Sequence, residues 1–197
     1  MKNIKTQLSL ALIAGSLIFT ACGNNGQKTD EHDHGDHDHS MEERSVSSNT
    51  VEVNGDLSPV LETYFLLTSS LARDDASGAA EAGSKMVTAI NGFDKTLLDE
   101  TQLKEFNEVA ESALENAEHI SENAGEIDHQ REHLVSLSED IRDMIALVGT
   151  SQKLYEDFCP MANDSQGAIW ISNQKEINNP YMGSAMPTCG KIKREIN

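Results

Sequence analysis

The chain has few basic side chains: 15 Lys and Arg residues stand against 33 Asp and Glu residues among 197, which gives a formal charge of −18. This deficit argues against binding to nucleic acid or to an anionic membrane surface through electrostatics, and it favours cations near the protein. Acidity that only keeps the protein soluble would account for the same charge. The length leaves room for one domain of ordinary size plus appendages.

Sequence motifs of catalysis are also missing. The chain has no nucleophile motif, no phosphate-binding glycine loop and no convincing pair of catalytic carboxylates. Cys159 with His129 or His133 would be a conceivable thiol–imidazole dyad, but no oxyanion-binding or substrate-binding pattern accompanies it. We therefore expect a binding protein and not an enzyme.

The apolar stretch near the start, Leu8 to Phe19, is short for a transmembrane helix and follows two lysines, so it predicts an export signal. Residues 18–23 resemble a bacterial lipobox, with Phe19 where leucine is usual. That resemblance implies that residues 1–21 are a lipoprotein signal peptide and that Cys22 is lipidated. The mature chain, with 13 basic and 33 acidic residues and a charge of −20, would then be anchored to a membrane on the periplasmic or outer-surface side.

Residues 22–55 predict a disordered linker, because they are rich in Gly, Asn, Ser, Asp and Glu and hold almost no apolar side chain. Residues 31–39 of this linker alternate acids with four histidines, which are His32, His34, His37 and His39. Imidazoles at this density can wrap a divalent ion, and they favour Cu(II) and Zn(II) over harder ions. Ordering a flexible segment weakens binding, so we expect a weak collecting or transfer arm.

From Leu57 onward the apolar residues recur every three or four positions in four stripes, which predicts four amphipathic helices. The stripes are Leu57, Leu61, Tyr64, Leu67 and Leu71; Ala79, Gly83, Met86, Ile90 and Phe93; Leu103, Phe106, Ala110, Ala113, Ala117, Ile120 and Ala124; and Ile127, Leu134, Leu137, Ile141, Met144 and Val148. Ser58 before Pro59 predicts an N-cap, and Asp99 with Gln102 predicts a capping box. We therefore expect residues 56–197 to form an all-α domain, an up-and-down four-helix bundle with a C-terminal tail.

Three histidines fall on the predicted bundle. At about 100° per residue, His119 points away from the apolar stripe of its helix and is expected to be solvated. His129 and His133 are four residues apart on one face, a spacing that can chelate one ion but is common without metal. Residues 131–133 could instead anchor the tail to the bundle by hydrogen bonds and charge pairs.

After Gly149 the helical pattern ends. β-prone residues at 154–158 and 169–171 predict two short extended segments in a tail of loops, and Trp170 is expected to pack this tail onto the bundle.

The tail also carries Cys159 and Cys189, with Met161 and Met186 in Cys-x-Met and Met-x-x-Cys spacings. Soft sulfur donors of this kind favour Cu(I). Two other interpretations stay open: a structural disulfide with the methionines in a core, or two unpaired buried thiols.

A longer set of residues in the tail and the fourth helix has a recognisable order and spacing. The set comprises Phe158–Ala162, Gly167–Ala168, Trp170–Ser172, Ile177, Asn179–Tyr181, Gly183, Met186 and Cys189–Gly190, with Arg131–His133 and Leu137–Ser138 upstream. It resembles the signature of the domain-of-unknown-function 3347 family, which occurs as stand-alone bacterial lipoproteins and as a C-terminal extension of periplasmic adaptor subunits of copper and silver efflux pumps.

The resemblance implies a helical bundle followed by a Cys/Met-bearing tail over about residues 55–197, and a role in copper or silver handling. The positions that fit a ligand set are Cys159, Met161, Met186 and Cys189, whereas Met182 stands where the family usually has an aromatic residue.

Two hypotheses follow from the sequence. The first is a lipid-anchored extracytoplasmic protein that binds a copper or silver ion, for sequestration or for delivery to heavy-metal efflux pump components. The alternative is an interaction module without metal, in which a Cys159–Cys189 disulfide staples a tail that docks a membrane or efflux-pump partner.

Overall fold

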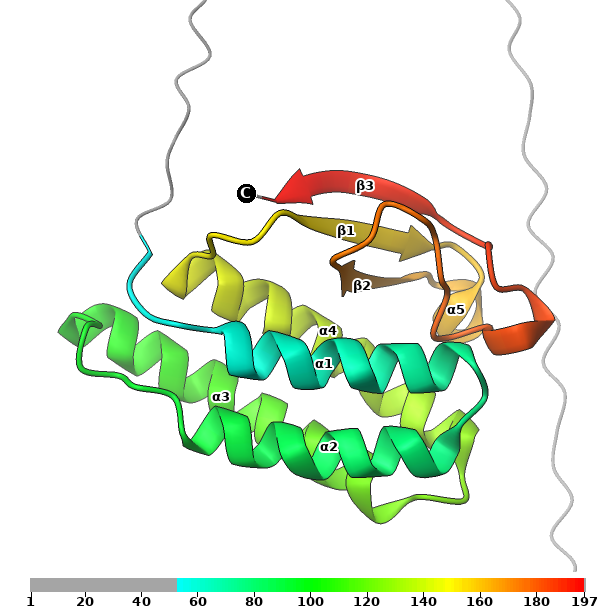
Figure 1. The fold of residues 1–197 in the computed structure, drawn as a ribbon, viewed down its shortest axis with the longest axis horizontal. Helices are drawn as coiled ribbons and strands as arrows, with labels where there is room; N and C mark the ends of the chain where they lie inside the picture. Colours follow the sequence, from blue (N-terminus) through cyan, green and yellow to red (C-terminus); the bar gives the residue numbers. More distant parts are fainter. Residues whose placement is uncertain (1–52, 197) are drawn as a thin grey trace, which may run out of the picture. The chain divides into compact units, whose positions relative to one another are not determined.

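The computed structural model describes residues 53–196 (Figure 1). Within these residues four long helices come first, and three strands follow, with two short helical turns between them. The elements are α1 (Ser58–Ala72), α2 (Ala76–Asn91), α3 (Glu100–Glu122), α4 (Ile127–Val148), β1 (Leu154–Cys159), α5 (Ala162–Ser165), β2 (Ala168–Ser172), the 3-10 turn η1 (Gly183–Ala185) and β3 (Lys191–Ile196). No helix within this range is long and apolar enough to cross a bilayer. The predicted signal peptide, Cys22 and the four histidines of residues 31–39 lie outside the described residues.

The four predicted helices are confirmed, and each packs against the next along the chain. The capping box at the start of α3 is present, because Asp99 accepts a hydrogen bond from the Gln102 backbone and the Gln102 side chain accepts one from the Asp99 backbone. The predicted cap at α1 is wrong. Ser58 is already helical, and its backbone N–H donates a hydrogen bond to the Asp56 carboxylate at 2.9 Å.

The predicted stripes form the core of the bundle, with Leu103 and Ile127 only partly buried and Ala124 exposed. Small residues on α2 let it approach α3 closely. A Cβ added to Gly83 would lie 2.9 Å from the carbonyl oxygen of Ala117, so the two backbones are nearly in contact there.

The all-α prediction is only partly right, because a three-stranded antiparallel sheet follows the bundle in the order β2-β1-β3. The two predicted extended segments are β1 and β2, and Cys159 pairs with Ala168 between them. Strand β3 was not predicted, since it is a mostly exposed edge strand rich in charged residues. Its register also shifts opposite Glu156 and Asp157, which breaks the period-two pattern.

Buried hydroxyls join the sheet to the helices. Ser138 of α4 is hydrogen bonded to the Tyr64 hydroxyl of α1 at 2.8 Å, and its oxygen lies 3.2 Å from the Tyr181 hydroxyl oxygen. Both tyrosines also bond the backbone of β2: the Ile171 N–H donates to Tyr64, and Tyr181 donates to the Ile169 carbonyl. A satisfied polar network of this kind fixes one docking geometry for the sheet. Trp170, as predicted, is buried in the same core.

Candidate metal centres

Two cysteines that are 30 residues apart meet at one end of the sheet. The Sγ atoms of Cys159 and Cys189 are 3.4 Å apart, and both thiols are free. Cys159 ends strand β1 and is fully buried, whereas Cys189 lies in the loop before β3 and is half-buried. The structure therefore places the two predicted cysteine ligands in direct contact, at a position that can be reached from the Cys189 side.

Asn179 holds the Cys189 loop in place. Its side-chain amide donates to the Cys189 carbonyl at 2.5 Å and accepts from the backbone N–H groups of Tyr181 and Met182, while its own N–H donates to the Pro187 carbonyl. The side chain is fully buried. Asn179 was not predicted as a positioning residue, although it belongs to the Asn179–Tyr181 segment of the family signature.

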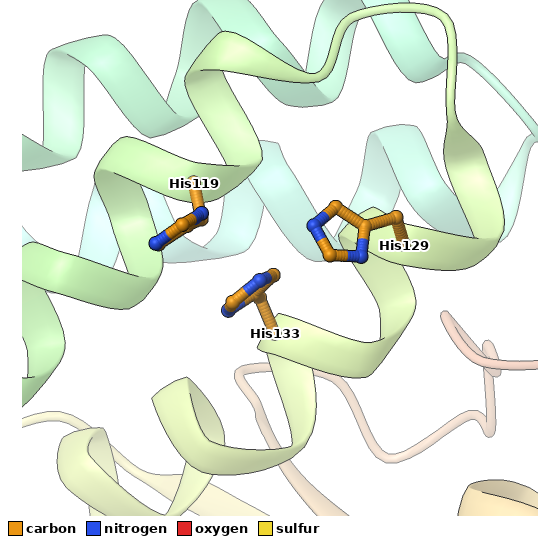
Figure 2. A group of neighbouring side chains, drawn as sticks. All are labelled: His119, His129 and His133. Carbon is orange, nitrogen blue, oxygen red and sulfur yellow. The ribbon is translucent and has the colours of Figure 1, made fainter.

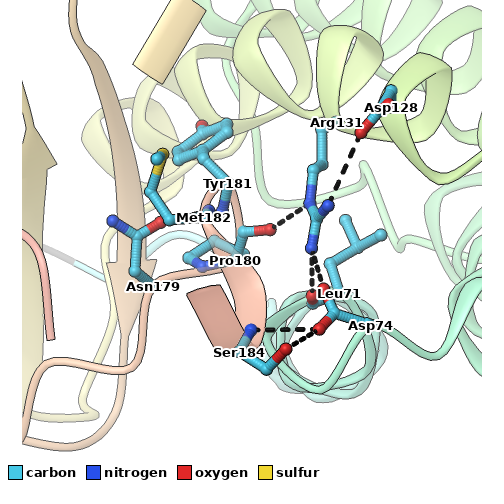
Figure 3. Close-up of polar contacts among 9 residues, drawn as sticks. All are labelled: Leu71, Asp74, Asp128, Arg131, Asn179, Pro180, Tyr181, Met182 and Ser184. Atoms are coloured by element: carbon cyan, nitrogen blue, oxygen red, sulfur yellow. Dashed lines mark hydrogen bonds and ion pairs between the residues drawn. The ribbon is translucent and has the colours of Figure 1, made fainter. Parts of the chain in front are cut away.

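Arg131 of α4 anchors the same loop to the bundle (Figure 3). Its Nε donates to the Pro180 carbonyl and its Nη2 donates to the Leu71 carbonyl, both at 2.9 Å, and Nη2 also pairs with the Asp74 carboxylate. Asp74 in turn accepts from the backbone and hydroxyl of Ser184. Hydrogen bonds from Ser184, and then from Arg131, lower the pKa of Asp74 to about 2. Of the residues 131–133, Arg131 thus anchors the tail.

The three candidate methionines differ in how they lie relative to the two thiols. Met161 lies in the turn after β1 with half of its surface exposed. Met186 is half-buried, and its carbonyl accepts the Cys189 N–H at 3.1 Å, so the two residues share one turn. Met182, which stands where the family usually has an aromatic residue, is half-buried and packs against the core.

A buried acid lies two residues before Cys159 on strand β1. Asp157 shares one face of β1 with Cys159, since side chains alternate along a strand. Neither of its carboxylate oxygens has a hydrogen-bond partner among the described residues, and burial raises its pKa to about 7. The sequence pattern did not reveal it, because an acid in a short strand looks like a solvent-facing residue.

The second group of candidate ligands lies where α3 meets α4 (Figure 2). His119, His129 and His133 each place a ring nitrogen within 4.8 Å of the other two. The prediction that His119 is solvated is only partly right: it is half-buried and its ring stacks on His133, with centroids 4.4 Å apart. Helical angle alone missed this, because the partner comes from the neighbouring helix.

The fold and these sites define a small protein with a four-helix bundle, a sheet-bearing tail and two clusters of metal-ligating side-chain types. The family predicted from the sequence is confirmed: residues 60–153 match the model of the family described as Protein of unknown function (DUF3347). The match covers almost all of the bundle and ends before β1, so it does not include Cys159 or Cys189. Comparisons with curated proteins and with solved structures found no match.

Proposed function

We propose that the protein is a membrane-anchored, extracytoplasmic protein that binds Cu(I) or Ag(I) through Cys159 and Cys189, for sequestration or for delivery to efflux. The observation that carries the proposal is the 3.4 Å separation of the two Sγ atoms. Thiolates are the ligands that soft monovalent ions of this group prefer. The acidic chain, with a charge of −18, favours cations at its surface.

The spacing of the thiols suits a chelate. With metal–sulfur bonds of about 2.3 Å, as for zinc, two sulfurs on one ion lie about 3.4 Å apart at an angle near 95° and about 4.6 Å apart when linear. The Sγ atoms are already at the shorter of these two distances, so the Cys189 sulfur needs to move by only about 1 Å to reach the longer one. Met161 and Met186, each close in sequence to one of the cysteines, are the proposed thioether donors.

The protons of the two thiols must leave when both sulfurs bind a metal as thiolates. The hydrogen bond with Cys159, followed by burial, raises the pKa of the Cys189 thiol. Ion binding that deprotonates both thiols therefore competes with protons and should strengthen as the pH rises.

The same contact also supports a second candidate function, a docking module with a Cys159–Cys189 disulfide and no metal. The Sγ atoms need to approach by about 1.4 Å to form that bond. Titration of free thiols in protein purified without reductant separates the two functions, because only the docking module would be isolated with its cysteines oxidised.

Competition with a chromophoric Cu(I) chelator tests the metal proposal on the reduced full chain. We expect one bound ion, roughly a 100-fold loss of affinity in the double variant Cys159→Ser, Cys189→Ser, and smaller losses for Met161→Leu and Met186→Leu. Met144→Leu, a swap of similar volume in the bundle core, is the matched methionine control and should bind as the parent does. Unchanged affinity in the double cysteine variant would overturn the proposal.

The proposal includes the segments that lie outside the described residues. Lipidation of Cys22 would anchor the protein, and the four histidines His32, His34, His37 and His39 would collect Cu(II) or Zn(II) weakly. Deleting residues 31–39 should reduce Cu(II) uptake in calorimetry and leave Cu(I) binding and the melting temperature nearly unchanged. A large fall in melting temperature would show instead that this segment is part of the folded domain.

A further inference from the structure

The histidine cluster consists of His119, His129 and His133 and is separate from the thiol pair. His119 lies in the last turn of α3, and His129 and His133 lie in the first two turns of α4, so one helical hairpin carries all three (Figure 2). Their ligand atoms lie within 4.8 Å of one another. Two nitrogens bound tetrahedrally to one ion at about 2.05 Å lie about 3.4 Å apart, so modest side-chain rotation closes the remaining difference.

The hydrogen bonds around His133 leave a lone pair free. Its Nδ1 is 3.0 Å from the side-chain oxygen of Asn116, whose amide nitrogen donates to the Ser112 carbonyl at 2.9 Å and to Asp140. Because both partners of that nitrogen are acceptors, the orientation of the Asn116 amide is fixed by the network. An amide oxygen only accepts, so Nδ1 of His133 carries the proton and Nε2 carries the lone pair that a metal needs.

His129 is arranged in the same way. Its Nδ1 is 3.0 Å from a carboxylate oxygen of Glu132 one turn along α4. This pair is exposed and contributes little stability by itself. A metal-bound histidine, however, almost always donates its second ring N–H to a carboxylate, carbonyl or water, which orients the ring. Two of the three histidines therefore already have the outer partners that metal ligands have.

Acidic side chains also act on the cluster. Burial, and then the nearby His119 and His129, lower the pKa of His133. Glu115 and Glu132 act in the opposite direction on the same ring. Those acids would also stabilise a bound cation.

The His119 ring must rotate before it can bind the same ion as His129 and His133. Its ring is parallel to that of His133, with an angle of 5° between the planes, so the two in-plane lone pairs cannot point at one ion in this arrangement. His133 is held by Asn116, whereas no hydrogen bond to the His119 ring is present within residues 53–196. Rotation of His119 out of the stack is therefore the movement that ion binding requires.

We propose that His119, His129 and His133 bind one divalent cation of the kind that prefers imidazole, as Zn2+ and Cu2+ do, at a site separate from the thiol pair. Three protein ligands on a half-exposed surface leave a fourth position open to water or to an incoming donor, the arrangement that distinguishes exchangeable sites from closed structural ones. Asn116 and Glu132 are positioning residues that orient two of the ligands.

Zn2+ calorimetry on the full chain tests this site. The parent for the experiment carries Cys159→Ser and Cys189→Ser, together with His32→Asn, His34→Asn, His37→Asn and His39→Asn. Neither the thiol pair nor the N-terminal histidines then contribute. We expect one Zn2+ per chain, roughly a 100-fold loss of affinity in His119→Gln, and about a 10-fold loss in Asn116→Ala, which keeps all three ligands but loses an outer partner. Zinc should also shift the ring resonances of all three histidines in NMR spectra.

The matched control is Glu118→Gln, which removes an exposed charge from the residue next to His119. It should change the Zn2+ affinity less than threefold, and urea unfolding confirms that each variant is folded. Equal Zn2+ affinity in the parent and in His119→Gln would overturn the proposal, and so would an equal loss in Glu118→Gln, which would indicate a diffuse acidic surface. Because the parent lacks Cys159 and Cys189, neither result depends on the Cu(I) proposal.

Discussion

The histidine cluster joins side chains of one helical hairpin, whereas the thiol pair joins residues 30 positions apart on a strand and a loop. The first is held by helix geometry and by short-range partners such as Glu132, one turn away. The second depends on Asn179 and on the contact of Arg131 with Pro180, which bring distant parts of the chain together. Damage to the docked tail should therefore abolish the thiol site first and leave the histidine site intact.

The two sites also differ in donor chemistry. Sulfur donors select soft monovalent ions and are consumed by oxidation, while imidazoles select borderline divalent ions and are insensitive to a mild oxidant. A protein with both can respond to the oxidation state of copper and of its surroundings.

Oxidation should produce the largest separation. Linking Cys159 and Cys189 as a disulfide, with Cys22 replaced by serine, should abolish Ag(I) binding and leave Zn2+ binding at the histidines unchanged. Closing a loop of about 30 residues should raise the free energy of unfolding by roughly 3.5 to 4 kcal/mol in the chain-entropy model. Melting curves of the oxidised, reduced and silver-loaded reduced protein measure this. If silver adds no stability to the reduced form while oxidation does, the tail is a stapled docking element.

Gly183→Ala should be the next most damaging change. Gly183 has φ +52°, and an added Cβ would collide with the Asp74 carboxylate and the Arg131 guanidinium. Backbone strain and the broken anchor together should cost about 2 to 3 kcal/mol in urea unfolding and should weaken Ag(I) binding more than Zn2+ binding.

Gly125→Ala is the matched control for that substitution, because a Cβ there has no neighbour within 4 Å. It should leave both metal affinities as they are. Equal losses of Ag(I) and Zn2+ affinity in Gly183→Ala would mean that the two sites are not structurally independent.

The helical bundle was easier to predict from the sequence than the sheet-bearing tail. Four apolar stripes and a capping box were sufficient for the helices, because burial there repeats every three or four residues. Strand β3 escaped prediction since its side chains are mainly charged and Lys193 is an extra residue in the register. That irregularity lets the consecutive Lys193 and Arg194 both reach the buried Glu156, at 3.1 and 2.7 Å.

The sites show a similar limit. The cysteine spacing and the family signature pointed to Cys159 and Cys189, and the i, i+4 rule pointed to His129 and His133. His119, Asn116 and Asn179 could not be found in this way, because their roles come from side chains on other elements. A single helix pattern describes which face is apolar and does not describe which polar residue the next helix places opposite.

Tyr181→Phe should have a moderate effect. It removes the hydroxyl that bonds the Ile169 carbonyl and Ser138, leaving a buried carbonyl with one partner fewer. We expect a loss of about 1 to 2 kcal/mol in urea unfolding and an unchanged Zn2+ affinity. Tyr155→Phe, in which the lost hydroxyl does not contact Ser138, is the control and should stay within about 0.5 kcal/mol. A larger effect in the control would mean that the Ser138 network is not what docks the sheet.

The smallest expected effect comes from Asp140, which accepts hydrogen bonds from Ser112 and Asn116 beneath the histidine cluster. Burial raises its pKa from 3.8 to about 6, although both hydrogen bonds oppose the shift. A raised carboxyl pKa means that folding favours the protonated form. The contribution of this group to the free energy of unfolding is therefore highest below pH 4, falls as the pH rises from about 4 to 6, and stays low above that.

Asp140→Asn removes this penalty, so the variant should be more stable than the parent at pH 7 by about 1 kcal/mol, a figure reduced for partial solvent screening, and equal to it below pH 4. Glu139→Gln, an exposed neighbour, reports the effect of losing one charge without burial. In Asp140→Asn the Asn116 amide loses a charged acceptor, so its hydrogen bond to His133 should weaken. The Zn2+ affinity of that variant should fall by less than about 10-fold, while its Ag(I) affinity stays constant. A variant that is less stable than the parent at pH 7 would show that the hydrogen bonds to Asp140 outweigh the cost of burying its charge.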